Sequence, residues 1–250
     1  MSVANHSNQH KTQKIGFILL RGFTMLSFAS VIEVMRMTNY LSQSELYSWH
    51  VYQDQDDACA SNGLHVANTI RKEELFECDI VFVCGGIHVQ TATTASIKQL
   101  LQQLAAQGNI ILGGLCTGSI ALALANLMDG YHSAVHWESL PAAKEAFLKV
   151  KFGEQLYVID KDRYTCSGGT AAIDMMLQLV RLQHGKALGG QMRIGHADAK
   201  QAQCLAGVRS CKNKSRLRAL PQQHLSKHRR SLPPARPEGA HANGAAAPPG

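Results

Sequence analysis

Three mostly apolar runs, each with a small residue at or just beyond its end, constrain the fold of this chain more than any other feature. They cover residues 15–20, 79–84 and 110–115. Because these runs are apolar without alternation, each is typical of a strand that is buried on both faces of a sheet. The segments that follow them have apolar residues at helical spacing: 25–41, 96–106 and 117–128. Strand followed by helix, repeated along the chain, predicts an α/β fold with a mostly parallel sheet between helices.

Cys116 is the most informative residue at the predicted edge of this sheet. It follows the third strand directly and precedes a helix that starts near Thr117. Backbone N–H groups and the helix dipole stabilise a thiolate at such a position. Gly85 and Gly86 end the neighbouring strand, and in a parallel sheet the ligand crevice lies outside the carboxyl ends of the strands. The elbow around Cys116 is therefore the expected place for chemistry or ligand binding.

The charge of the chain divides sharply between a body and a tail. Residues 191–250 hold 11 Lys and Arg against two Asp and Glu, whereas residues 1–190 are slightly acidic, and the net charge is +7. The tail also has six of the seven prolines and no aromatic residue. Such a composition buries little apolar surface. We therefore expect a folded body followed by a disordered basic C-terminal tail.

The cysteines and the N-terminus indicate a cytoplasmic protein that does not insert into a membrane. The seven cysteines are an odd number without a Cys-x-x-Cys pair, so reduced thiols are expected. The first residues lack the apolar core of a secretory signal, and no apolar stretch reaches the roughly 20 residues that cross a bilayer. No cluster has metal-ligand spacing, so neither a metal nor another cofactor is expected.

Several motifs of the body occur together in one known superfamily. They are SFAS-x-IEVMR-x-TN at 27–39, ASNG at 60–63, VCGG at 83–86, GGLCTGS at 113–119, LMDGY to HWE at 127–138 and TCSGGTAAIDMML at 165–177. With this ordered set the chain resembles the DJ-1/PfpI superfamily of the class I glutamine amidotransferase-like fold, and within it the GlxA-like regulators of the AraC family. The resemblance implies a flavodoxin-like three-layer sandwich over residues 14–184 that serves as a ligand-sensing domain.

In that group the resemblance implies a homodimer in which a small metabolite, often nitrogen-containing, changes DNA binding. The implied ligand contacts lie at the elbow and beside it: Gly85, Gly86, Ile87, Cys116, Thr117, His136 and Trp137. Gly85 and Gly86 present N–H groups to an anionic atom or only permit a tight turn, and both readings can hold at once. Trp137 either holds a cationic nitrogen on its indole face or belongs to the core, and a place in the core is favoured.

Catalysis is the weaker expectation, with Cys116 and His136 as the candidate residues. Enzymes of the superfamily commonly place His after the cysteine and an acidic side chain near the end of the first strand. This chain has Thr117 and, by distance from Gly22, Ser27 at those positions. Three readings stay open for the cysteine: a ligand pocket or redox-sensitive thiol, a nucleophile of a hydrolase, hydratase or glyoxalase, and a small residue that fills a tight turn. A redox module that acts through dimerisation is a further alternative.

Residues 185–250 depart from the regulator pattern, in which an AraC-type helix-turn-helix domain follows the sensing domain. They carry basic clusters at 212–218 and 227–230 but no amphipathic helix long enough to enter a DNA groove. Such a tail makes weak, salt-dependent contacts with phosphates, so specific DNA binding is expected only of an intact full-length form. The change in composition near Gly189 favours a truncated regulator with a shifted reading frame, and the alternative is a natural basic tail.

Overall fold

The computed structural model describes residues 11–54 and 59–194. Within them strands and helices alternate as the apolar runs predict. The basic tail from residue 195 onward lies outside the described residues. In these two described ranges, no helix combines the length and the hydropathy that crossing a bilayer requires.

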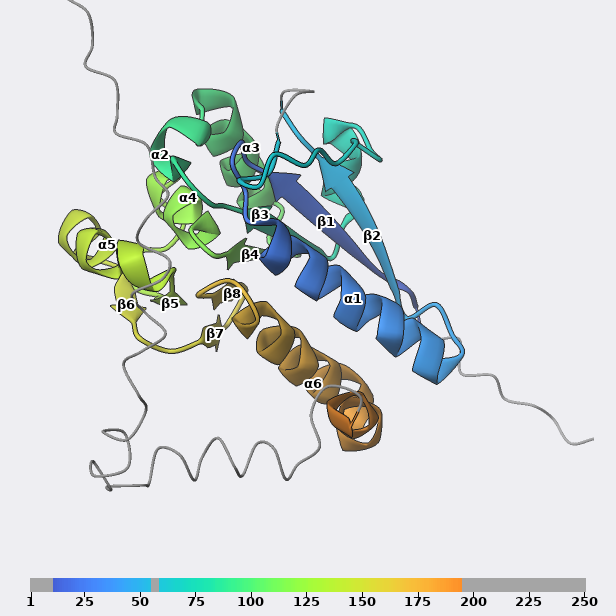
Figure 1. Ribbon diagram of the computed structural model, residues 1–250. Coiled ribbons are helices and arrows are strands. Elements are labelled where there is room, and N and C mark those ends of the chain that lie inside the picture. The colour runs from blue at the N-terminus through green and yellow to red at the C-terminus, as the bar shows by residue number, and fades with distance from the viewer. Residues whose placement is uncertain (1–10, 55–58, 195–250) are drawn as a thin grey trace, which may run out of the picture. The chain divides into compact units, whose positions relative to one another are not determined.

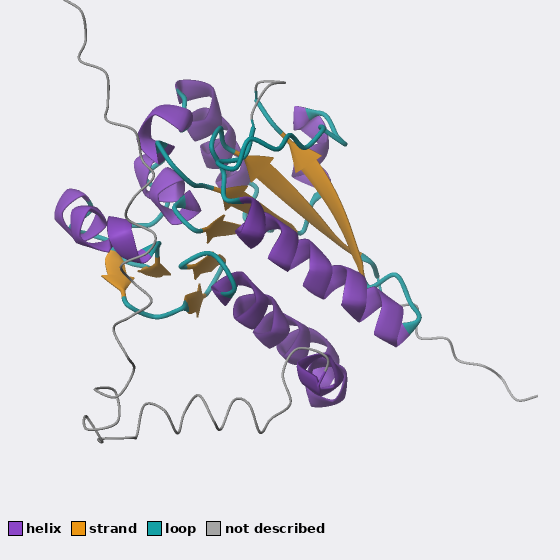
Figure 2. Cartoon of the chain, in the orientation of Figure 1, coloured by secondary structure: helices purple, strands orange, loops and turns teal. Residues whose placement is uncertain are grey.

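Six strands form the central sheet (Figure 2). Their order is β2 (Tyr47–Tyr52), β1 (Gln13–Leu19), β3 (Ile80–Cys84), β4 (Ile111–Leu115), β8 (Arg163–Cys166) and β7 (Tyr157–Asp160). β7 and β8 form an antiparallel hairpin, and every other neighbouring pair is parallel. The chain moves outward from β1 to β2 and then returns to the other side of β1 for β3. This reversal creates a topological switch point between the carboxyl ends of β1 and β3.

Helices cover both faces of this sheet and confirm the predicted flavodoxin-like three-layer sandwich (Figure 1). One layer holds α1 (Met25–Ser42) and α6 (Ala171–Ile194), which pack against each other. The opposite layer holds α2 (Val89–Ala92), α3 (Ala95–Ala106) and α4 (Gly118–Leu124). Within α6 the backbone leaves the helical region at Gly185, and helical backbone then resumes up to Ile194.

The two helical layers bury separate halves of the hydrophobic core. Alternate residues of a strand point to opposite faces, so Phe17 packs toward α1 and α6 while Ile18 packs toward α3 and α4. The rings of Phe17 and Phe28 meet edge to face with their centroids 5.1 Å apart, which ties β1 to α1. Burial of each such side chain contributes about 1.5–3 kcal/mol. Strands that are apolar on both faces are therefore stable only between two layers of helices.

Several short elements go beyond what the apolar pattern predicts. They are η1 (Lys72–Glu77), η2 (Trp137–Ser139), α5 (Leu140–Ala146) and a small parallel sheet of β5 (His132–Ala134) and β6 (Lys151–Gly153). Elements this short cannot show a periodic pattern. α4 is also shorter than the expected helix at 117–128, because it ends at Leu124 and the left-handed backbone of Asn126 (φ +59°) prevents further helical turns.

Candidate functional site

Cys116 lies on a sharp turn between β4 and α4, as the sequence predicts. Its backbone is left-handed (φ +60°), a conformation that residues with a side chain rarely adopt. A Cβ atom on Gly114 would lie 2.3 Å from the backbone nitrogen of Ser119, and one on Gly118 would lie 2.0 Å from the carbonyl oxygen of Val83. The small residues of the GGLCTGS motif are therefore required because α4 folds back closely over the sheet.

The thiol of Cys116 is buried and accepts two hydrogen bonds. Only 4% of the residue is exposed. The Thr24 hydroxyl donates to Sγ at 3.4 Å, and the backbone N–H of Thr117 donates to the same sulfur. Burial raises the pKa of this thiol, the two hydrogen bonds lower it, and the charge of Glu138 raises it again, so that the pKa lies above its ordinary value. At neutral pH Cys116 is therefore a protonated thiol.

Neither helper position implied by the resemblance places a base beside this thiol. Thr117 donates its hydroxyl to the carbonyl oxygen of Gly86 at 2.8 Å. Ser27 accepts a hydrogen bond from the backbone N–H of Gly169, also at 2.8 Å. The hydroxyl that reaches Sγ belongs to Thr24, which the sequence motifs did not single out. Its position directly before α1 is the signal that points to it.

Gly85 and Gly86 lie between the elbow and the segment that follows β1, where the packing leaves no space for a side chain at either position. A Cβ atom on Gly86 would lie 2.0 Å from the carbonyl oxygen of Gly22, and one on Gly85 would lie 2.5 Å from Thr117 Oγ1. The N–H of Gly85 donates to the carbonyl oxygen of Leu115 at 3.1 Å, so it is already occupied. Of the two readings of this glycine pair, packing supports the tight turn.

His136 and Trp137 lie on a separate segment that follows β5. His136 Nδ1 lies 3.7 Å from Glu138 Oε2, and the rings of His136 and Trp137 have their centroids 5.7 Å apart. Trp137 is 72% exposed, so the expectation that it belongs to the core is wrong. The reason is that η2 is a single short turn that buries none of its residues. Because the charge of Glu138 acts on the Cys116 thiol, this segment lies within electrostatic range of the elbow.

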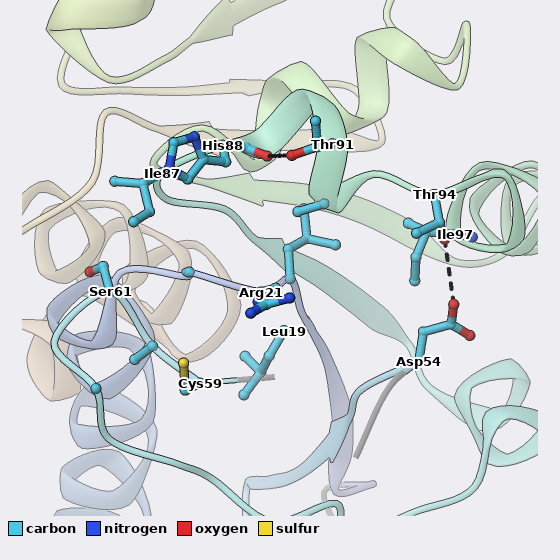
Figure 3. A pocket seen from close by; sticks show the side chains of 15 residues that line it. Leu19, Arg21, Asp54, Cys59, Ser61, Ile87, His88, Thr91, Thr94 and Ile97 are labelled. Carbon is cyan, nitrogen blue, oxygen red and sulfur yellow. Dashed lines mark hydrogen bonds between the residues drawn. The ribbon is translucent and has the colours of Figure 1, made fainter. Parts of the chain in front are cut away.

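A cavity of about 680 Å³ opens at the switch point between β1 and β3 (Figure 3). Four parts of the chain form its walls. They are the end of β1 with Arg21, described residues that follow β2 (Asp54, Cys59 and Ser61), the stretch from the end of β3 through α2 (Ile87, His88 and Thr91), and the start of α3 with Thr94 and Ile97. Of the ligand contacts expected from the sequence, Ile87 lines this cavity. The other six lie outside its lining: Gly85, Gly86, Cys116, Thr117, His136 and Trp137.

Backbone hydrogen bonds connect the elbow to the walls of this cavity. The N–H of Thr24 donates to Gly85 at 3.0 Å, and the N–H of Ile87 donates to Gly22 at 3.2 Å. The N–H of Gly22 in turn donates to Cys59 at 2.8 Å. The elbow thus helps to fix the segments that shape the cavity. In residues 11–54 and 59–194, no three His, Cys, Asp or Glu side chains are grouped closely enough to hold a metal ion.

Comparisons with known sequences agree with these features. Residues 13–182 match the DJ-1/PfpI family. The HTH-type transcriptional regulator GbdR of Pseudomonas aeruginosa is 46% identical over 177 residues, which make up 70% of this chain and 48% of the regulator. The HTH-type transcriptional regulator CdhR of the same species is 38% identical over 72% of this chain and 54% of its own length. The chain thus spans about half the length of these curated relatives.

Solved structures and one enzyme complete the comparison. An AraC family transcriptional regulator from Pseudomonas putida aligns with a TM-score of 0.66 and 28% identity over 74% of this chain and 100% of that chain. DJ-1beta of Drosophila melanogaster, at 16% identity and a TM-score of 0.61, shares the fold. Isonitrile hydratase of Pseudomonas putida is 26% identical over 67% of this chain and 71% of the enzyme. Since the family match runs from the first strand into the last helix, the chain belongs to the DJ-1/PfpI family.

Proposed function

We propose that residues 14–184 form the effector-sensing domain of a GlxA-like transcriptional regulator that acts in the cytoplasm. The domain binds a small nitrogen-containing metabolite at the carboxyl edge of the sheet near Cys116, and binding changes the interaction of the regulator with DNA. The relatives support this proposal, because GbdR and CdhR are transcriptional regulators whose aligned half is this domain.

The state of Cys116 is the observation that favours recognition over catalysis. Its thiol is protonated at neutral pH because burial raises its pKa, and the groups that contact it are the hydroxyl of Thr24 and the amide of Thr117. A cysteine nucleophile needs a thiolate, or a base that takes its proton. The elbow therefore keeps the binding edge in shape and does not attack the ligand.

Dimerisation and DNA binding belong to the same proposal. The regulator is a homodimer, and specific DNA binding requires a helix-turn-helix domain in the intact protein. The basic segment at 185–250, whose first ten residues continue α6, touches phosphates without reading bases. Translation of the two other reading frames downstream of residue 189 tests the frame-shift hypothesis, because it predicts a helix-turn-helix sequence in one of them. Its absence from both would remove that hypothesis.

A thermal-shift screen of amino acids and betaine-like metabolites on the full chain tests the sensing function. We expect at least one compound to raise the melting temperature with increasing concentration, because a ligand that binds only the folded state stabilises it. The same compound should stay chemically unchanged during prolonged incubation, as followed by nuclear magnetic resonance of the mixture. Stabilisation by no metabolite, or its conversion to a product, would contradict the proposed function.

A cysteine-dependent hydrolase, hydratase or glyoxalase is the second candidate. The left-handed backbone of Cys116 favours it, because such an elbow presents a nucleophile between a strand and a helix. Isonitrile hydratase also shares this domain at 26% identity. Turnover of an isonitrile, an amide or methylglyoxal by purified protein, lost in Cys116→Ser, would establish this reading. Turnover that persists in the variant would exclude Cys116 as the nucleophile.

A further inference from the structure

We infer that the cavity at the β1–β3 switch point is the effector site and takes a small dipolar ion, with the carboxylate of the ligand at Arg21 and its cationic nitrogen at Asp54. This inference rests on the proposed sensing function. It adds the position of the site, two recognition residues and the charges that the ligand carries.

The position and the size of the cavity both fit a ligand site. In open α/β sheets ligands bind outside the carboxyl ends of the strands where the strand order reverses, which in this sheet is between β1 and β3. A volume of about 680 Å³ falls within the roughly 300–1,000 Å³ of small-molecule sites. The elbow itself offers little surface to a ligand, because Cys116 and Thr117 are both buried.

Arg21 brings a positive charge to this cavity that no group among the described residues neutralises. It directly follows β1, is exposed and lines the cavity (Figure 3). Within the described residues it forms neither an ion pair nor a side-chain hydrogen bond, whereas Arg36 pairs with Glu33 at 2.7 Å and Arg163 with Asp162 at 2.6 Å. A guanidinium without an ion-pair partner is able to bind a carboxylate through two parallel N–H groups. Arg21 therefore selects ligands with a negative end.

Asp54 brings a negative charge from another wall. Its carboxylate accepts hydrogen bonds from the hydroxyls of Tyr52 and Ser96, each at 3.1 Å, and of Thr94 at 3.4 Å. Figure 3 shows the carboxylate of Asp54 held toward the start of α3. These neutral donors orient the carboxylate but leave its charge in place, and no cation of the described residues pairs with it. Asp54 therefore selects ligands with a positive end.

Aliphatic side chains make up part of the remaining lining of the cavity. Leu20, Ile87 and Ile97 are among them. Such a wall accommodates the methylene or methyl groups of a ligand, and it makes the loss of hydration costly for any charge that finds no partner. A ligand with only a carboxylate or only an amine leaves Asp54 or Arg21 without its partner. The cavity consequently discriminates against singly charged molecules of the same length.

Calorimetric titration of the full chain with matched small molecules tests this site. The dipolar probes are glycine, 4-aminobutyrate and glycine betaine, and the singly charged counterparts are butyrate and butylammonium. We expect at least one dipolar probe to bind. Both singly charged probes should bind with an affinity at least about tenfold lower, because each of them loses one charge interaction.

Two substitutions test the recognition residues directly. Arg21→Gln and Asp54→Asn each remove one charge with little change in shape, and each should weaken the best dipolar probe by about tenfold or more. Arg21→Gln should also remove the preference for that probe over butylammonium. The controls are Arg36→Gln and Asp129→Asn, which remove exposed charges that are paired with Glu33 and Lys149. Both control variants should bind like the wild type.

The outcomes separate this inference from the proposed function. Unchanged affinity in Arg21→Gln and Asp54→Asn, or binding by none of the dipolar probes, would overturn the site. If Cys116→Ala weakens the binding of a metabolite and Arg21→Gln does not, the ligand binds at the elbow and not in this cavity. That result would overturn the site and leave the sensing function intact. A dipolar probe that binds at Arg21 but does not alter DNA binding by a regulator carrying this domain would support the site and contradict the function.

Discussion

Cys116 has the left-handed backbone conformation that is typical of a nucleophile at a strand-to-helix turn, but its side chain is buried like that of a core residue. A left-handed backbone at a residue with a side chain costs on the order of 1–3 kcal/mol. The turn persists because Gly114 and Gly118 bring α4 directly against the sheet. The two hydrogen bonds to Sγ do not offset the effect of burial on the pKa of the thiol. The strained turn at Cys116 thus holds the neighbouring segments in place, but it does not produce a reactive thiolate.

Slow alkylation of Cys116 is the first prediction at the residue scale. At neutral pH the thiol of Cys116 should react with iodoacetamide at least about tenfold more slowly than that of Cys59. The reason is that the thiolate is the reactive species and burial disfavours the thiolate. Cys59 is the matched thiol, since it is partly exposed on the wall of the cavity. Peptide mapping at timed intervals measures the rate at each cysteine separately. Faster modification of Cys116 than of Cys59 would contradict the protonated, covered state.

Thr24→Val should raise the pKa of the Cys116 thiol still further. The Thr24 hydroxyl donates to Sγ and lowers this pKa, so its removal disfavours the thiolate. The pH–rate profile for alkylation of Cys116 should therefore shift toward higher pH. Thr93→Val is the matched control, because the buried hydroxyl of Thr93 donates to Val89 instead. A shift in the opposite direction, or an equal shift in the control, would show that Thr24 does not tune the thiol.

At the scale of elements, the close approach of the β1 and β3 ends depends on a residue without a side chain. Gly86→Ala should lower the free energy of unfolding by about 3 kcal/mol, because its Cβ would meet the backbone of Gly22, which cannot move aside easily. Gly153→Ala is the control, since its Cβ would meet only the flexible side chain of Gln155. Urea unfolding of both variants measures the difference. Equal losses of stability would contradict the proposed packing of this turn.

The central strands were predictable because burial on both faces marks every residue of a strand. The runs at 15–20, 79–84 and 110–115 correspond to β1, β3 and β4, and the helical spacing at 25–41 corresponds to α1. β5 and β6 were not predictable, because three residues carry no periodicity. Trp137 was misplaced for a related reason: an aromatic side chain is usually buried, and the sequence does not reveal that η2 is a lone surface turn.

The elbow was predictable, but the cavity was not. Cys116 stands inside a local pattern of strand, small residues and helix, which the sequence displays directly. Arg21 and Asp54 follow different strands, and the positions that they take around one cavity depend on the strand order and on the path of the connecting segments. The sequence presents both as ordinary surface charges. What marks them is that neither has an ion-pair partner among the described residues, a property that depends on the folded chain and not on local sequence.

At the scale of the whole molecule, buried thiols make the stability of the hydrophobic core sensitive to alkaline pH. Cys166 belongs to the cluster that faces α1 and α6, and Cys78 belongs to the cluster that faces α3 and α4. Burial raises the pKa of each of these thiols to about 11, from an ordinary value near 9. Both halves of the core therefore favour the protonated form of a cysteine.

This arrangement predicts a loss of stability at alkaline pH. Because the pKa of each thiol is higher in the folded chain than in the unfolded chain, its contribution to stability is complete below about pH 9 and is lost between about pH 9 and 11. Two pKa units correspond to roughly 3 kcal/mol per thiol. Urea unfolding under reducing conditions across this range measures the decline. Cys78→Ala and Cys166→Ala should each make it shallower than in the wild type. An equally steep decline in the variant lacking both Cys78 and Cys166 would assign alkaline unfolding to groups other than these thiols.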